Sequence, residues 1–253
     1  MIIAIDIGNT DVVVGFYEQE WKHIFRVASN LEMEAVEYEK RLREFLLEED
    51  IPVPTIQKVI LSSVVPDLTP VIKEVFHQFY EGEIVVVDGV LLEQLSLGNI
   101  NPYELGSDLA ANAVGAFERF NQSTIVVDFG TALTFTSVDD HREILGVAIA
   151  PGVRTAMKSL SSNTARLPEI PLEIPSKVLG NNTVEALQAG IMQGYVGLVR
   201  HMVNQVKLEM GGTPKVIATG GLSFIFEPLH DLFDAMDVNL TLDGLRSILN
   251  QLK

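Results

Sequence analysis

The chain of 253 residues contains no cysteine, and none of its apolar runs is long. The absence of cysteine excludes disulfide bonds and thiolate metal sites, and it fits a reducing cytoplasm. No apolar run approaches the roughly 20 residues that a membrane-spanning helix requires. No basic stretch precedes the first apolar run at Ile2, so we do not expect a signal peptide. The sequence therefore predicts a cytoplasmic protein that does not enter a membrane.

Basic residues are scarce relative to acidic ones: lysine and arginine total 18 against 34 acids, which gives a formal net charge of −16. Such a chain repels nucleic-acid backbones and anionic membranes, so neither is expected as a partner. A phosphate-bearing ligand would need local help from backbone N–H groups, metal ions or a few well-placed cations. The 47% apolar content is ample for hydrophobic cores, in one large domain or in two of about 120 residues each.

An apolar strand that ends in an aspartate and turns on a glycine occurs twice, as IIAIDIGNT at 2–10 and TIVVDFGT at 124–131. Glycine permits a tight turn and lets a phosphate approach the backbone, while carboxylate oxygens suit a hard ion such as Mg²⁺. A simple hairpin with turn-forming side chains is the alternative, and the repetition argues against it. The candidate ligand-binding residues of the two turns are Asp6, Gly8, Asn9, Thr10, Asp128, Gly130 and Thr131.

A second pair of similar stretches supports a duplication: KVILSSVV at 58–65 and KVIATGGL at 215–222. The offset between the copies is 122 residues for the aspartates (128 − 6) and 157 residues for these stretches (215 − 58), so the second half carries an insertion. In the later stretch, Gly220 and Gly221 leave bare backbone against which a phosphate or a flat ring can lie. A glycine-containing turn between a strand and a helix is the plainer alternative.

Both halves are predicted to begin with a three-stranded antiparallel meander and to continue with helices that alternate with strands. The predicted strands cover residues 2–7, 12–18, 22–28, 59–63, 84–88, 124–128, 132–138, 143–149 and 216–218. The predicted helices cover 31–50, 66–80 with Asp67 as its cap, 106–120, a segment from about 152, 183–210 and two weaker ones near the C-terminus. This repeated order predicts an α/β fold of two similar domains, 1–121 and 122–253, with a nucleotide held between them.

Beyond the two turns, the chain closely resembles the type III pantothenate kinases, a family of the acetate and sugar kinase, Hsp70 and actin superfamily. The matching stretches are DIGNT at 6–10, SSVVP at 62–66, NPYELGSD at 101–108, ANAVGA at 111–116, VVDFGTA at 126–132, APG at 150–152, ARLP at 165–168, NNTVEALQAGI at 181–191 and VIATGGL at 216–222. The resemblance implies two duplicated RNase H-like domains of the actin and Hsp70 ATPase type, with a central cleft. It also implies ATP-dependent phosphorylation of the 4′-hydroxyl of pantothenate, the first committed step towards coenzyme A. The family works as a homodimer with Mg²⁺ and a monovalent cation, K⁺ or NH₄⁺.

The resemblance also implies roles for individual residues. Asp6 would position Mg²⁺–ATP, and Asp128 would bind the monovalent cation. The remaining nucleotide contacts would be Gly8, Asn9, Thr10, Gly130, Thr131, Gly220 and Gly221. Asp108 would be the general base that accepts the proton of the acceptor hydroxyl; a helix N-cap is the alternative role for this residue. The substrate contacts would be Asn99, Gly106, Ser107, Leu109 and Thr183.

Two of these substrate positions depart from the family pattern. Leu109 stands where the family has an arginine directly after the base, and Asn99 stands where it has an aromatic residue. Losing a guanidinium from a carboxylate-binding pocket removes a charge-assisted pair worth roughly 1.5–3 kcal/mol. Two alternatives therefore stay open: a non-catalytic paralogue that binds nucleotide or a pantothenate-like ligand as a regulator, and a kinase for a different small alcohol.

Overall fold

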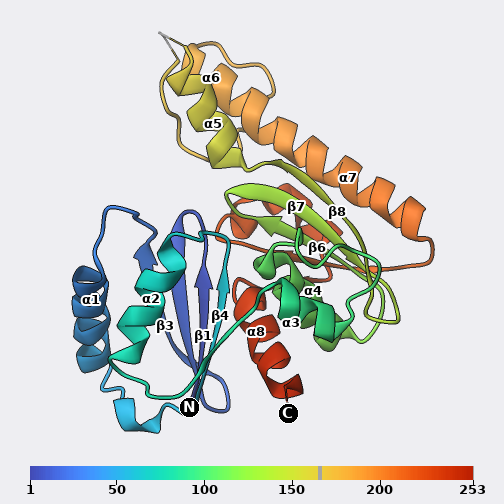
Figure 1. Ribbon diagram of the computed structural model, residues 1–253. Helices are drawn as coiled ribbons and strands as arrows, with labels where there is room; N and C mark the ends of the chain where they lie inside the picture. The colour runs from blue at the N-terminus through green and yellow to red at the C-terminus, as the bar shows by residue number, and fades with distance from the viewer. Residues whose placement is uncertain (165–166, 253) are drawn as a thin grey trace. The chain divides into compact units, whose positions relative to one another are not determined.

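The computed structural model describes residues 1–164 and 167–252, and it contains two five-stranded sheets flanked by helices (Figure 1). The predicted α/β class is confirmed. Ala165 and Arg166, which belong to the ARLP stretch, lie outside the described residues. Internal contacts divide the chain into two compact units. Unit 1 comprises Met1–Leu97, Asn101–Gly115 and Thr241–Lys253, and unit 2 comprises Gly98–Ile100 and Ala116–Leu240.

The sheet of unit 1 has the strand order β3-β2-β1-β4-β5. Its strands are β1 (Ile2–Ile7), β2 (Asp11–Tyr17), β3 (Trp21–Ala28), β4 (Lys58–Ser63) and β5 (Ile84–Val86). The first three strands form the predicted antiparallel meander, while β4 and β5 run parallel to β1. Side chains alternate between the two faces of a strand. Ile3, Ile5 and Ile7 therefore enter one core, whereas Asp6 lies on the opposite face, near the carboxyl end of β1.

Five helices belong wholly or mainly to unit 1. They are α1 (Ala35–Glu48), α2 (Leu68–His77), α3 (Gly89–Leu95), α4 (Ser107–Phe120) and α8 (Leu240–Gln251). Helices α1 and α2 cover the isoleucine face of the sheet, since Leu42, Leu46 and Ile72 belong to the same core. Helix α3 was not predicted; the carboxylate of Asp88 caps it by accepting a 2.9 Å hydrogen bond from Leu91 N. A short 3₁₀ turn, η1 (Val53–Thr55), precedes β4.

The sheet of unit 2 repeats this topology in the order β8-β7-β6-β9-β10. Its strands are β6 (Thr124–Phe129), β7 (Ala132–Val138), β8 (Ile144–Pro151), β9 (Lys215–Thr219) and β10 (Ala235–Met236). The pairing register matches as well: Lys58 lies opposite the first residue of β1, and Lys215 lies opposite the first residue of β6. The duplication inferred from the two sequence offsets is therefore confirmed at the level of strand pairing.

The helices of unit 2 are α5 (Val153–Ser162), α6 (Thr183–Gln188) and α7 (Gly194–Met210), with a π-helical segment η2 (Ala189–Gln193) and two 3₁₀ segments, η3 (Ser223–Ile225) and η4 (Glu227–Leu232). The predicted uninterrupted helix over 183–210 is wrong in one respect, because η2 inserts a wider turn. A π turn rotates the residues that follow it relative to an α-helical register. Val199 and Val203 are consequently fully buried in α7, while Leu198 and Met202 are only partly buried.

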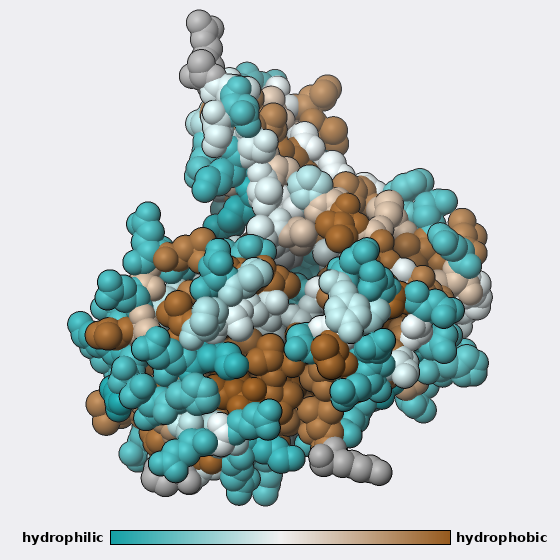
Figure 2. Space-filling model, in the orientation of Figure 1, coloured by the Kyte–Doolittle hydropathy of each residue, from teal (hydrophilic) through white to brown (hydrophobic). Residues whose placement is uncertain are grey.

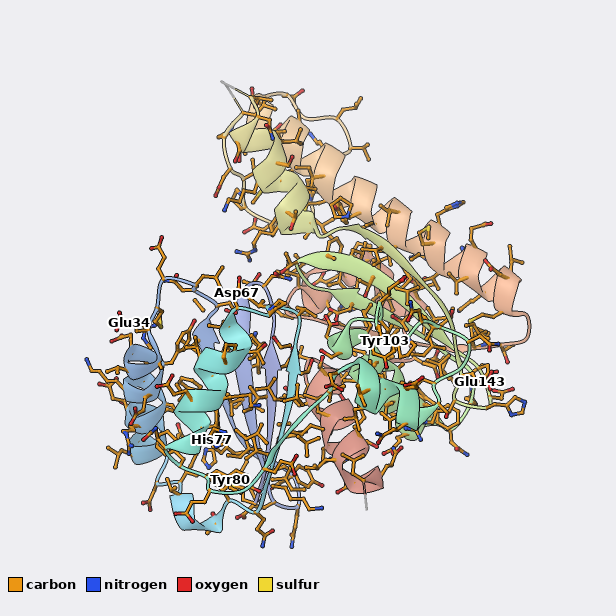
Figure 3. The ribbon with its side chains drawn as sticks, in the orientation of Figure 1. Glu34, Asp67, His77, Tyr80, Tyr103 and Glu143 are labelled. Atoms are coloured by element: carbon orange, nitrogen blue, oxygen red, sulfur yellow. The ribbon has the colours of Figure 1, made fainter. Side chains whose placement is uncertain are left out.

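The structure also corrects the predicted helix starts in unit 1. Glu34 and Asp67 stand immediately before α1 and α2 (Figure 3), but neither side chain makes a capping hydrogen bond. Asp67 has a helical backbone conformation, which does not suit an N-cap residue. The first amides of α2 instead donate to the carbonyl of Val65. Turn geometry of the backbone, and not the predicted carboxylate cap, therefore begins this helix.

Helix α8 belongs to unit 1 although it follows unit 2 in the sequence. The predicted domain boundary between residues 121 and 122 stays a prediction, since compactness alone does not show which segments fold independently. Hydrophilic residues cover much of the visible face of the molecule (Figure 2), in line with the acidic composition. Among the described residues, no helix combines the length and apolarity that crossing a bilayer requires.

Candidate active site

The turn between β1 and β2 presents polar side chains on a backbone held by hydrogen bonds. Gly8 N donates to Asp11 O at 3.0 Å, and Ser29 N donates to Thr10 O at 2.9 Å. A Cβ atom on Gly8 would lie 3.2 Å from Asp11 O, so glycine suits this tight turn. Asn9 and Thr10 are exposed at its tip. The turn therefore fixes the backbone and places two exposed polar side chains at its tip.

A network of serine hydroxyls joins the end of β4 to the start of α4. Ser62 lies beside Asp6 in the sheet register, and its hydroxyl is 2.9 Å from the hydroxyl of Ser107. The Ser107 hydroxyl also accepts from Ser63 N at 3.0 Å. Ser62 and Ser107 are 0% and 6% exposed. The hydroxyl of the predicted substrate residue Ser107 thus bonds to β4. These bonds fix the first turn of α4 near the end of β1 that carries Asp6.

Asp108 occupies the second position of α4 rather than the N-cap. Its Oδ1 accepts a 2.8 Å hydrogen bond from Leu109 N. Burial raises the pKa of this carboxyl above its ordinary value, while the hydrogen bond from Leu109 N opposes the rise. A carboxylate with a raised pKa is a stronger base when ionised. The capping alternative is therefore not what the geometry shows, and the position suits proton transfer.

The residues on either side of Asp108 shape its surroundings. A Cβ atom on Gly106 would lie 2.5 Å from Asp108 Oδ1, so a side chain at this position would collide with the carboxylate. Leu109, which replaces the family's arginine, is 9% exposed. The structure therefore gathers the predicted residues of unit 1 at one edge of its sheet. They are Asp6, Gly8, Asn9, Thr10, Gly106, Ser107, Asp108 and Leu109.

In unit 2, glycines surround the second aspartate. Asp128 pairs with Thr134 on one side and with Thr219 on the other. Gly220 has a φ of +85°, and a Cβ atom there would overlap with Asp128 Oδ1. A Cβ atom on Gly130 would lie 3.4 Å from the same oxygen. The predicted Gly220 thus has two physical reasons to be glycine: a left-handed backbone and the carboxylate beside it.

Gly152, which directly precedes α5, and Thr155 of α5 hold the neighbouring turn, and the sequence alone did not single them out as site residues. Gly152 N donates to Thr131 O at 3.0 Å, and the Thr155 hydroxyl donates to the same carbonyl at 2.7 Å. A Cβ atom on Gly152 would overlap with Gly130 O. The APG stretch contains Gly152, which was the available signal, but its contact with the turn is long-range. The first turn of α5 therefore lies directly at Thr131.

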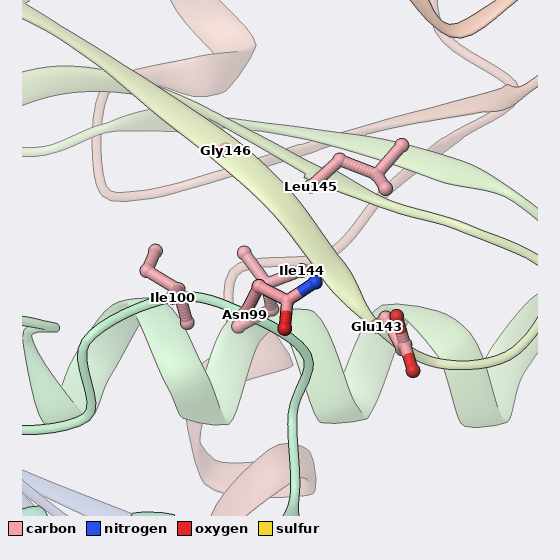
Figure 4. Close-up of a pocket in the computed structure, with 6 residues that line it drawn as sticks. All are labelled: Asn99, Ile100, Glu143, Ile144, Leu145 and Gly146. Carbon is pink, nitrogen blue, oxygen red and sulfur yellow. The ribbon is translucent and has the colours of Figure 1, made fainter.

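The other two predicted substrate residues lie elsewhere in unit 2. Asn99 belongs to the segment that packs on the start of β8, where a cavity of about 200 Å³ is lined by Asn99, Ile100, Glu143, Ile144, Leu145 and Gly146 (Figure 4). Gly98, with a φ of +99°, begins this close approach. Thr183 is exposed at the first position of α6. Asn182 caps that helix by accepting from Glu185 N at 3.0 Å.

The donor atoms at the end of β1 fit the Mg²⁺ that the family resemblance implies. Mg²⁺ takes one or two protein carboxylates and completes its shell with water and phosphate oxygens. Asp6 supplies such a carboxylate beside exposed Asn9 and Thr10. Among the residues that the structure describes, no three histidine or acidic side chains cluster as a metal cage. An ion at Asp6 would therefore be bound together with a phosphate rather than by protein alone.

Comparisons with known proteins agree with this geometry. The family model described as type III pantothenate kinase matches residues 2–205. A type III pantothenate kinase of Moorella thermoacetica is 39% identical over 249 residues, which covers 98% of each chain. One from Dehalococcoides mccartyi is 37% identical over 252 residues, covering 98% of this chain and 94% of that protein.

A solved structure supports the fold independently. The activator of the 2-hydroxyisocaproyl-CoA dehydratase from Clostridium difficile, solved with bound ADPNP, aligns with a TM-score of 0.53 at 12% identity. The alignment covers 98% of this chain and 92% of that chain. At this identity the likeness concerns fold alone, and it agrees with the duplicated α/β architecture of actin- and Hsp70-type ATPases. By its sequence along nearly its whole length, this chain belongs to the type III pantothenate kinase family.

Proposed function

We propose that this protein transfers the γ-phosphoryl group of ATP to the 4′-hydroxyl of pantothenate, the first step of coenzyme A synthesis. Sequence identity over almost the full length of curated relatives supports this function. The observation that carries it is the place of Asp108. Ser107 ties the first turn of α4 to β4, beside the strand that ends in Asp6. One edge of a sheet thus offers both a carboxylate for a metal–phosphate complex and a second one for proton transfer.

In this proposal the residues of unit 1 bind Mg²⁺, orient the phosphate oxygens and deprotonate the acceptor hydroxyl. Asp108 accepts the proton of the acceptor hydroxyl. The hydroxyl oxygen attacks the γ-phosphorus in line, and ADP is the leaving group. Gly8, Asn9 and Thr10 orient phosphate oxygens through the backbone and side chains of the turn. The carboxylate of Asp6 would hold Mg²⁺, which would neutralise part of the phosphate charge.

The turn of unit 2 is proposed to contact the nucleotide and a monovalent cation, K⁺ or NH₄⁺. Asp128 is flanked by two threonine-bearing strand positions, and oxygen ligands of this kind suit such an ion. Gly130, Thr131, Gly220 and Gly221 would lie against the nucleotide. A Cβ atom on Gly221 would have no neighbour within 4 Å, so the backbone there is open to a ligand.

The residues expected to contact the acceptor depart most from the family pattern. We propose that Gly106, Ser107 and Leu109 frame the acceptor near Asp108, and that Asn99 and Thr183 have the substrate-contact role that the family resemblance implies. Leu109 is buried and apolar, which favours an acceptor with more apolar character as the second candidate. Assaying a panel of hydroxylated acceptors separates the two, because a strong preference for another alcohol would overturn pantothenate as the substrate.

We also propose that the protein works in the cytoplasm as a homodimer. Gly190, Gly194 and Gly197 follow one another along η2 and α7, and a Cβ atom on any of them would have no neighbour within 4 Å. Such a strip allows another backbone to approach closely. Light scattering in solution checks the dimer, and a monomer at micromolar concentration would contradict it.

The test of function is release of ADP from ATP, measured with pantothenate, Mg²⁺ and K⁺. Asp108→Asn should lower kcat by a factor of about 10²–10⁴, since it removes the proton acceptor, and it should leave ATP affinity nearly unchanged. Glu104→Gln is the matched control, because this exposed carboxylate lies in the same stretch and bonds only to Asn101 Nδ2 in the part of the chain described. Wild-type protein that releases no ADP would support the regulator alternative. Full activity in Asp108→Asn would remove the base assignment.

A further inference from the structure

Helix α8 lies against the sheet of unit 1 that carries Asp6. The indole of Trp21 donates to Asp243 Oδ1 at 2.9 Å, and the guanidinium of Arg246 lies 4.7 Å from the ring centre of Tyr17. On the sheet itself, a Cβ atom on Gly15 would lie 2.9 Å from Leu242 Cδ1. Gly15 pairs with Ala4 of β1, so it belongs to the same face of the sheet as Asp6. One side of α8 is thus fixed to that face.

Another side of α8 contacts α4, the helix that carries Asp108. The Thr241 hydroxyl donates a 2.8 Å hydrogen bond to Asn112 Oδ1, and Asn112 is 0% exposed. A Cβ atom on Gly244 would overlap with the carbonyl of Ala111, so the two helix backbones are in direct contact. Asn112 follows Asp108 by one helical turn and lies on the same side of α4. The bond therefore acts on the turn next to the proposed base.

The side chains of α4 make this hydrogen bond more important than it would be in an ordinary helix pair. Ala110, Ala111 and Ala113 are all buried, and Ala111 lies directly against Gly244 of α8. Small side chains interlock weakly, so they leave sliding and rotation of a helix poorly fixed. The buried hydrogen bond from Thr241 to Asn112 then helps to fix the register, because shifting either helix would break it.

We propose that Thr241, through Asn112, is a positioning residue that sets where Asp108 lies relative to the turn between β1 and β2. The proposal rests on the function proposed above. Ser107 fixes the first turn of α4 to β4, and Thr241 fixes the second turn to α8. Helix α8 in turn is bonded to the hairpin of β2 and β3. The C-terminal helix, which lies beyond the residues matched by the family model, thus completes the support of the base.

The test compares three variants of the full chain on α8. Thr241→Val removes the hydroxyl with little change of shape, and it should lower kcat between about tenfold and 100-fold, the scale expected for a displaced catalytic group. The KM for ATP should stay near the wild-type value. Thr241→Ser keeps the donor and should restore most of the rate. Ser247→Ala is the matched control: Ser247 is 3% exposed, and its hydroxyl has no hydrogen-bond partner among the described residues.

A readout that does not depend on turnover keeps the proposal separate from the proposed function. In Thr241→Val, amide hydrogen exchange should become faster at residues 108–112, and it should stay unchanged in Ser247→Ala. Wild-type protein without pantothenate-dependent ADP release contradicts the function, while the exchange data still decide the positioning. Unchanged exchange and wild-type kcat in a folded Thr241→Val protein would overturn the proposal. Equal losses in Thr241→Val and Thr241→Ser would overturn it too, because the hydroxyl would not be the cause.

Discussion

The two units use one strand topology to hold two different environments around an aspartate. In unit 1 the residue beside Asp6 on the parallel strand is Ser62, and in unit 2 the residue beside Asp128 is Thr219. The residues that follow differ more. Ser63 N donates to the Ser107 hydroxyl of α4, whereas a Cβ atom on Gly220 would overlap with the Asp128 carboxylate. The same strand end therefore anchors a helix in one unit and exposes backbone in the other.

The two copies of the duplicated fold therefore place different chemical groups at the same strand end. A helix bonded to the strand end places an additional acidic side chain, Asp108, at a fixed position. Bare glycine backbone instead lets a ligand approach closely. The strand order is alike in both units, so the specialisation depends on which side chains follow each aspartate. Substitutions at these positions test the comparison, because we expect different effects on stability, ATP binding and kcat in the two units.

The largest effect is expected at Gly220. Gly220→Ala forces a left-handed backbone on a residue with a Cβ atom, which costs roughly 1–2 kcal/mol, and the new atom also collides with Asp128. We expect a loss of stability above this range and weaker ATP binding, measured by urea unfolding and calorimetry. Gly221→Ala is the control for stability alone, because a Cβ atom there meets nothing within 4 Å. If both variants lost the same stability, the special environment in unit 2 would not depend on Gly220.

A smaller effect is expected at the corresponding place in unit 1. Ser107→Ala removes the hydroxyl that accepts from Ser63 N and leaves that partly buried amide unpaired, which costs about 1–3 kcal/mol. Because the first turn of α4 loosens, kcat should fall while the KM for ATP changes little. Ser162→Ala, at an exposed serine of unit 2, should stay within about 0.5 kcal/mol of wild type. A raised KM for ATP with normal kcat would show that Ser107 acts on the nucleotide instead.

Much of this architecture could be predicted from the sequence, because apolar runs that end in aspartate and glycine are local signals. Both meanders and the duplicated strand register followed from them. The short helix α3 was missed because its capping Asp88 reads equally well as the end of a strand. The π segment η2 was missed because apolar periodicity cannot show one extra residue in a turn.

The sequence indicated the candidate site residues, whose roles stay predictions, but it could not indicate the contacts that support them. The motifs indicated Asp6, Asp108 and Asp128 directly. The bond from Thr155 to Thr131, and the bond from Thr241 to Asn112, join residues far apart in the sequence. Neither leaves a local pattern, so only the folded chain reveals which helix holds which turn. Reading Asp108 as a helix cap was likewise a local inference, and the observed start of α4 does not support it.

The smallest predicted effect distinguishes the buried carboxyl group of Asp108 from an exposed acidic residue. Burial raises the pKa of Asp108, so the folded state binds a proton there more tightly than the unfolded state does. Stability from this group is therefore fully present below the unfolded pKa and is lost as the pH rises through the folded pKa. Catalysis needs the opposite, ionised form, so kcat should fall with decreasing pH at a higher pH than for an unperturbed aspartate.

Asp108→Asn separates these two demands on one side chain. The amide oxygen can still accept from Leu109 N, while the buried charge is gone. We expect this variant to unfold at a slightly higher temperature than wild type at neutral pH, and at the same temperature once the pH is below the ordinary aspartate pKa. Glu104→Gln, at an exposed carboxylate, should show no such crossover. A lower melting temperature for Asp108→Asn at neutral pH would mean that the charge stabilises the fold. Asp108 would then be a structural carboxylate like the capping Asp88, and not a base kept ionised at a cost in stability.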